Sequence, residues 1–131
     1  MDPQQEFFTE LRARLKTAYP GMVYDTRLPA VGTPYPFIYL GGSGQRDSAT
    51  KSVLLGYATQ SVRVWHSDPH KRGTVSALLV GIKQAARSIT QTAHYQWRVE
   101  ISAQDITDDA TVQPPLLMGI LEITAHFSPI C

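Results

Sequence analysis

The stretch Leu116-Leu-Met-Gly-Ile-Leu-Glu-Ile-Thr-Ala-His-Phe127 carries the strongest strand signal in the chain. Successive side chains of a strand point to opposite faces of its sheet. One face of this stretch carries four large apolar side chains: Leu117, Leu121, Ile123 and Phe127. The other face is also apolar near its start, at Leu116, Met118 and Ile120. We therefore expect a strand that lies in the centre of a sheet or at an interface.

Four other segments have the composition of strands: residues 22–25, 36–40, 52–66 and 95–104. In the last of them, five side chains alternate cleanly with polar ones and are expected to face inward: Tyr95, Trp97, Val99, Ile101 and Ala103. In residues 52–66 the apolar face changes along the strand, from Val53, Leu55 and Tyr57 to Val62 and Val64. This change of parity predicts a bulge near Thr59 and Gln60.

Two segments have helical spacing. In the first, Asp2 is a candidate N-cap and Pro3 suits the first helical position. Phe7, Leu11 and Leu15 then form an apolar stripe, and Glu10 and Arg14 can pair across one turn. In the second, six apolar residues recur at helical spacing: Val75, Leu78, Leu79, Ile82, Ala86 and Ile89.

Two polar segments are expected to be loops, residues 41–51 and 105–115. The elements then follow the order helix, strand, strand, long strand, helix, strand, strand. This order predicts an α+β fold. We expect a mostly antiparallel sheet of four to five strands, with two helices packed on one face.

Length and composition suit one domain that spans residues 1–131. The formal net charge is only +1, so a strong electrostatic surface for nucleic acid is not expected. Cys131 is the only cysteine, so the chain cannot form an internal disulfide. No stretch has the composition of a signal peptide or a membrane span. These features are typical of a soluble protein made in a reducing cytoplasm.

The densest polar cluster is Trp65-His-Ser-Asp-Pro-His-Lys-Arg72. His66, Asp68 and His70 are two residues apart and could converge on a metal ion. Pro69, however, breaks the geometry of an extended segment. The alternative is a turn in which Asp68 caps the following helix and Pro69 begins it. We favour the turn.

Other polar groups have ordinary structural explanations. The Gly41-Gly-Ser-Gly-Gln-Arg46 segment lacks the following helix that a phosphate loop needs. Asp105, Asp108 and Asp109 could bind a cation, but we favour a solvated loop. Trp65 and Trp97 lie on strands and are expected to be core or interface residues. No arrangement of side chains predicts catalysis, so we expect neither an enzyme nor a cofactor.

The order of elements, together with several motifs, resembles the tail-completion or tail-terminator proteins of long-tailed bacteriophages. The matching segments are VYD at residues 23–25, GTPYPFIYLGG at 32–42, VRVWHS at 62–67, RGTVSALLVGIKQAARSI at 72–89 and MGILEITAHF at 118–127. The resemblance covers almost the whole chain. It implies a virion protein that is assembled in the host cytoplasm and forms a ring, usually a hexamer, at the head-proximal end of the tail tube. The implied partners are other copies of the chain, the tube protein, the head–tail connector and DNA that passes through the channel without specific binding. The ring would end tube polymerisation and join the tail to the head.

Four residues of the expected loop are candidates for a partner interface: Gln45, Arg46, Asp47 and Lys51. They are polar and lie between two strands, although a solvated hairpin tip explains them equally well. Two other functions stay open. One is a small metal-dependent enzyme or ligand-binding domain that uses His66, Asp68 and His70. The other is a head-completion adaptor on the same fold.

Overall fold

The structure is a computed structural model that describes residues 2–25, 27, 29, 32–49, 54–111 and 115–130. It contains two helices, α1 (Pro3–Ala18) and α2 (Arg72–Arg87), and five strands, β1 (Val23–Asp25), β2 (Phe37–Ala49), β3 (Leu54–His66), β4 (Tyr95–Asp109) and β5 (Leu116–Pro129). The strands form one sheet in the order β1-β2-β3-β5-β4. β1 is parallel to β2, and the other neighbouring pairs are antiparallel. The predicted α+β fold is confirmed.

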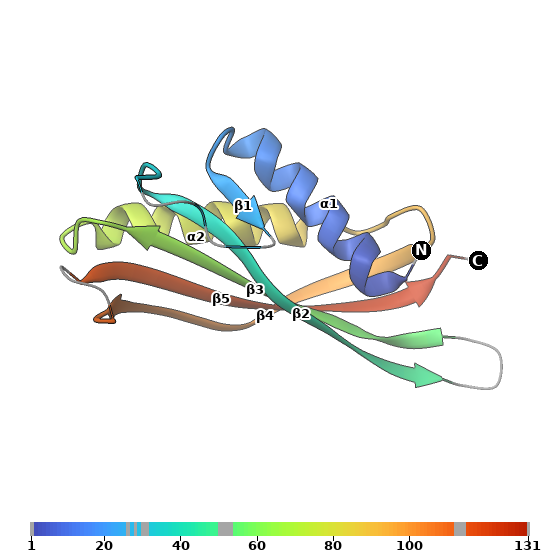
Figure 1. Cartoon of the computed structure of the whole chain (residues 1–131). Helices are drawn as coiled ribbons and strands as arrows, with labels where there is room; N and C mark the ends of the chain where they lie inside the picture. Colours follow the sequence, from blue (N-terminus) through green and yellow to red (C-terminus); the bar gives the residue numbers. More distant parts are fainter. Residues whose placement is uncertain are drawn as a thin grey trace.

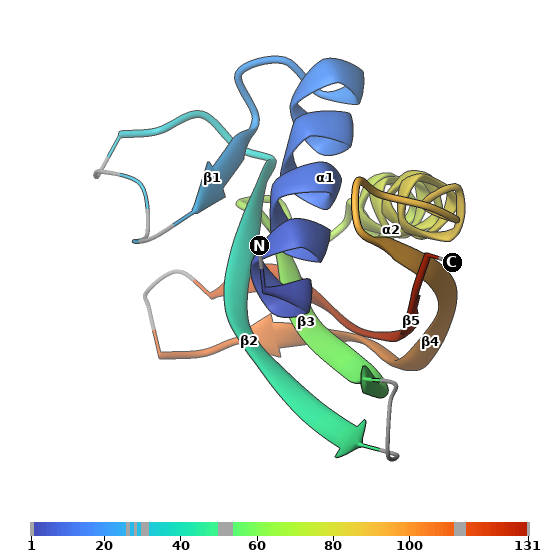
Figure 2. The same cartoon turned by 90° about the vertical axis from the view of Figure 1, so that its right-hand side faces the viewer.

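Both helices lie on the same face of the sheet (Figures 1 and 2). The core fills the space between the helices and the sheet. One row of β5 side chains points toward the helices and is buried there. This row contains Leu117, Leu121, Ile123, Ala125 and Phe127. β5 lies between β3 and β4, so the prediction of a central strand is confirmed. Leu116, Met118 and Ile120 are half-buried on the opposite face of the sheet.

The helices form where the apolar spacing predicts them, but their first residues differ from the prediction. Pro3 begins α1, yet the Asp2 side chain makes no capping hydrogen bond. The second helix begins at Arg72 with Lys71 at its N-cap, so Asp68 does not cap it and Pro69 does not begin it. The Asp68 carboxylate instead accepts a hydrogen bond from the His70 N–H, which stabilises the turn before the helix. Neither of these two helices is both long and apolar enough to cross a membrane.

Most of the first predicted loop is a strand. Residues 41–49 continue β2 and pair with β3, from Ser43 opposite Gln60 to Ala49 opposite Leu54. A register shift between Leu40 and Ser43 accommodates the extra residue of a bulge. The glycine-rich composition was misleading, because ladder hydrogen bonds to β3 offset the low strand propensity of this segment. Residues 50 and 51 lie outside the described residues.

The second predicted loop is also partly a strand, since β4 continues through Asp109. A register shift between Ile101 and Ala103 changes which side chains face the helices. Ala103 is therefore exposed, contrary to the prediction, and Ile106 packs against the core instead. The cause is the bulge, which exchanges the two faces of the strand beyond it.

The bulge predicted near Thr59 and Gln60 lies on the neighbouring strand. β3 keeps one continuous register with β5 from Gly56 to His66, whereas β2 carries the irregularity opposite. The inward-facing side chains of β3 keep a single parity and are buried: Ala58, Gln60, Val62 and Val64. Leu55 and Tyr57 therefore point away from the helices, and Val53 lies outside the described residues.

Candidate functional site

The cluster of His66, Asp68 and His70 forms a closed turn at the end of β3. The Asp68 N–H donates to His66 Nδ1 at 3.1 Å, and the Asp68 carboxylate accepts from the His70 N–H at 2.9 Å. That second hydrogen bond is the main cause of a lowered pKa of Asp68. The His70 side chain is 94% exposed, and its Nδ1 lies 3.3 Å from Asp68 Oδ1. Within the described ranges, no group of three or more potential ligands is placed to hold a metal ion.

Gln45, one of the candidate interface residues, contacts the beginning of α1. Its Oε1 accepts a hydrogen bond from the Gln4 N–H at 2.8 Å, and its Nε2 donates to Asp47 Oδ1 at 2.7 Å. Gln4 in turn donates from its side chain to Ser43 Oγ at 2.6 Å. A side chain on β2 therefore does the capping that was expected of Asp2.

We expect Gln45→Ala to lower the free energy of unfolding by about 1 kcal/mol, the usual cost of losing a cap. The reason is that the Gln4 N–H in the first turn of α1 loses its acceptor. Chemical denaturation would measure the effect, with Gln104→Ala on the exposed surface of β4 as the control. Equal stabilities of the two variants would contradict the assignment of Gln45 as a cap.

The other interface candidates do not lie together. Asp47 and Arg46 are on opposite faces of the sheet, and Lys51 is not among the described residues. Gln45 and Asp47 share the face that carries α1, whereas Arg46 points to the opposite face because strand side chains alternate. The Arg46 side chain is exposed. Asp47 is also exposed, but its carboxylate accepts the hydrogen bond from Gln45, whereas no side-chain bond involves Arg46 among the described residues.

Five aromatic rings form a cluster on the sheet face opposite the helices: Tyr24, Tyr35, Phe37, Tyr39 and Trp65. The ring centroids of Phe37 and Trp65 are 5.5 Å apart, and those of Tyr39 and Trp65 are 6.1 Å apart. Tyr35 contacts Phe37 and is 40% exposed. Trp65 is buried in this cluster and not in the main core, whereas Trp97 packs on Phe7 in the core.

The acidic residues at the end of β4 do not converge on a cation site. Asp109 Oδ1 accepts hydrogen bonds from the Thr111 hydroxyl and N–H, at 2.5 and 3.1 Å. These bonds are the main cause of a lowered pKa of Asp109, to which Trp65 makes a smaller contribution. Trp65 Nε1 itself is buried without a partner of ordinary hydrogen-bond geometry among the described residues.

A buried carboxylate that the sequence analysis did not single out lies at the first turn of α1. Glu6 is 7% exposed and accepts hydrogen bonds from Thr92 Oγ1 at 2.5 Å and from the His94 N–H at 2.8 Å. Its second oxygen lies 3.0 Å from His94 Nδ1. Trp97 Nε1 donates to Thr92 Oγ1, so the network reaches the core. The sequence signal was the position of Glu6 directly beside the apolar stripe of Phe7.

Glu6 has a lowered pKa. Burial raises the pKa of this carboxyl, but the hydrogen bonds from Thr92 and His94 and the charge of His94 together outweigh burial. The folded chain therefore stabilises the ionised form of the Glu6 carboxyl relative to the protonated form. This network joins α1 to the segment between α2 and β4.

We expect the stability difference between the unsubstituted chain and Glu6→Gln to decrease in acid. The contribution of the ionised carboxylate is fully present above the pKa of glutamate in the unfolded chain, about 4.3. It is lost as the pH falls through the lower pKa of the folded chain. Urea denaturation over a pH series would measure it. A difference that stays constant from neutral pH into strong acid would contradict it.

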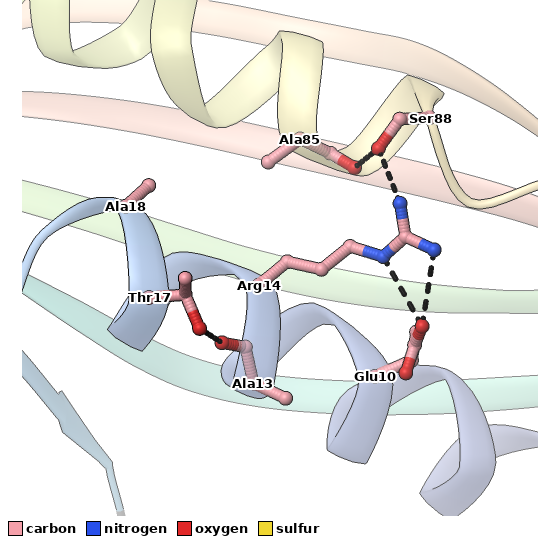
Figure 3. A pocket seen from close by; sticks show the side chains of 7 residues that line it. All are labelled: Glu10, Ala13, Arg14, Thr17, Ala18, Ala85 and Ser88. Carbon is pink, nitrogen blue, oxygen red and sulfur yellow. Dashed lines mark hydrogen bonds and ion pairs between the residues drawn. The ribbon is translucent and has the colours of Figure 1, made fainter.

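A shallow groove of about 390 Å³ lies between the two helices (Figure 3). Arg14 crosses it, with two bonds to Glu10 Oε1 and one from Nη1 to Ser88 Oγ at 2.7 Å. The predicted Glu10–Arg14 pair is thus confirmed, at 3.0 Å. The Arg14 guanidinium bonds to partners within the chain. It therefore links α1 to the end of α2 across the groove.

Comparison with known proteins shows a likeness to solved structures and none to a family model or a curated protein. Among solved structures, a chain described as belonging to the virion of a native gene transfer agent particle is similar over 96% of this chain and 94% of that chain. The TM-score is 0.67 and the sequence identity is 15%. This chain therefore shares its fold with a component of that particle.

Proposed function

We propose that this chain is a structural protein of a phage-like particle. The observation that carries the proposal is the shared fold, because the likeness to a chain of a gene transfer agent virion covers both chains almost completely. The chemistry of the described surface is compatible with this role. The turn of His66, Asp68 and His70 and the Arg14 guanidinium are engaged in bonds within the chain. Their arrangement supports a folded scaffold and does not support a reaction.

Within such a particle, the proposed position is the head-proximal end of the tail tube. The chain would form a ring that ends tube polymerisation and offers a surface to the head–tail connector. Support comes from the resemblance to tail-terminator proteins in its order of elements and its motifs. In this fold, residues 32–42 lead into and begin β2, residues 62–67 end β3, and residues 118–127 lie within β5.

The test uses a purified tail tube protein from the same phage-like particle. Purified protein is mixed with polymerised tubes and examined by negative-stain microscopy, while its native mass is measured alone and after mixing. We expect rings at one end of each tube and tubes that stop growing. Tubes that elongate unchanged and carry no added density would refute the terminator role. Density on heads without any on tubes would instead indicate a head-completion adaptor.

A further inference from the structure

The two outer edges of the sheet are complementary, and we propose that successive copies of this chain join through them. The outer edge of β2 in one copy, residues 42–49, would pair with the outer edge of β4 in the next copy, residues 99–109. The proposal rests on the proposed ring function and names the surfaces that would close the ring. The occupant of each edge is thus a second copy of this chain.

Half of the outer edge of β2 has no strand beside it in the described structure. β1 pairs with β2 only at Ile38, Tyr39 and Leu40. Beyond the bulge, the ladder partners recorded for β2 all belong to β3, on its inner side. The contacts of Gln4 with this segment reach side chains and not the β2 backbone. An extended segment with unpaired backbone groups is a template for strand addition.

Most of the outer edge of β4 is equally open. The segment before β4 covers its beginning, where the Trp97 N–H donates to the Thr90 carbonyl and the Thr92 N–H donates to the Tyr95 carbonyl. From Val99 to Asp109, the ladder partners within the described residues all belong to β5, on the inner side. Residues 102–105 are four consecutive exposed positions. This edge is long enough to receive the eight residues of the β2 edge.

Strand direction makes the two edges compatible. β2 to β3, β3 to β5 and β5 to β4 are all antiparallel, so β2 and β4 run in opposite directions. A second copy placed beside the first, with its helices on the same side, brings its β2 antiparallel to β4. Two different edges then meet at every junction. Such a head-to-tail contact closes into a ring when the rotation between copies is suitable, whereas a two-fold contact stops at a dimer.

Charge favours this pairing over pairing of like edges. Arg46 on β2 and Asp105 on β4 both point to the face opposite the helices, and both are exposed. Within the part of the chain that the structure describes, no ion pair involves either of them. The β4 edge also carries Asp108 and Asp109, so two β4 edges would bring like charges together, which is destabilising. On the face opposite the helices, the β2 edge supplies the opposite charge at Arg46, whereas Asp47 points to the face of the helices.

Cysteine cross-linking tests the proposal in the full chain. Cys131 is replaced by serine, and Arg46→Cys is combined with either Asp105→Cys or Glu100→Cys, two exposed positions on the same face of β4. A short bis-maleimide is then added to the protein alone and on tail tubes. Within one chain, the cysteines lie three strand spacings apart, at least about 14 Å, so the reagent reports contacts between copies. Arg46→Cys with Arg87→Cys, which is exposed on α2, is the matched control.

We expect a ladder of covalent oligomers that ends at the ring number for at least one β2–β4 pair. The control pair and each single-cysteine variant should stay monomeric on denaturing gels. Dimers from a single-cysteine variant would show a two-fold contact and overturn the proposal. Rings on tubes without any ladder would overturn it while leaving the proposed function intact. A protein that stays monomeric and never binds tubes would overturn both.

Discussion

Replacing Glu6 with alanine is expected to lower the free energy of unfolding by about 2–4 kcal/mol, far more than a surface carboxylate contributes. The cost comes from the donors that the substitution leaves behind. The Thr92 hydroxyl and the His94 N–H both point at the buried carboxylate and would lose their acceptor. Loss of an acceptor for a partly buried donor costs the desolvation of that donor in addition to the bond.

Urea denaturation at neutral pH would measure the effect of Glu6→Ala, and Glu10→Ala is the control. Glu10 lies one turn later on the same helix and is more than one-third exposed, and Arg14 is its only ion-pair partner among the described residues. An exposed ion pair of this kind contributes less than about 1 kcal/mol. Equal free energies of unfolding for the two variants would contradict the role of Glu6 in holding α1 to the segment before β4.

The main features of the fold could be predicted because they depend on side-chain periodicity. The stripe of Phe7, Leu11 and Leu15 places α1, and the four-turn stripe of the second helix places α2. The alternation in β5 identifies the central strand of the sheet. In each case, the residues that are apolar in the pattern are the ones that the core buries.

The ends of the long strands could not be predicted, because their stability comes from pairing and not from composition. Residues 41–49 contain three glycines and have low strand propensity, yet β3 pairs with them. Asp105 to Asp109 have a loop-like composition, yet β5 pairs with them. The two bulges that change the parity of β2 and β4 also leave no mark in the sequence. Because residues 41–49 were expected to be a loop, the candidate interface residues Gln45, Arg46 and Asp47 were expected on a loop. They lie instead on the edge of strand β2.

The remaining site residues show why a polar cluster in the sequence is a weak guide. His66, Asp68 and His70 satisfy each other and the local backbone. Glu6 was not selected, because its partners Thr92 and His94 are more than 80 residues away in the chain. Only the packing of α1 against the segment before β4 brings them together. A single carboxylate next to an apolar stripe does not specify its partner.

Gly119 is expected to be essential for the close contact between α2 and the sheet. It lies in β5, between Val64 on β3 and Ile106 on β4, at a position where glycine normally weakens a strand. A Cβ atom there would lie 2.8 Å from Val75 Cγ1 and 3.1 Å from Leu79 Cδ1. Val75 and Leu79 are fully buried on α2, so neither can move into open space.

We expect Gly119→Val to lower the free energy of unfolding by about 3 kcal/mol, because α2 would have to move away from the sheet. Gly42→Val is the control, since a Cβ atom at Gly42 meets nothing within 4 Å and valine favours strands. Combining Gly119→Val with Val75→Ala removes the contacting methyl groups, so the double variant should be more stable than the sum of the single effects predicts, by about 1 kcal/mol. Thermal and urea denaturation of the four proteins would measure this coupling. Strictly additive effects would show that the cost at Gly119 arises within the strand and not from its contact with α2.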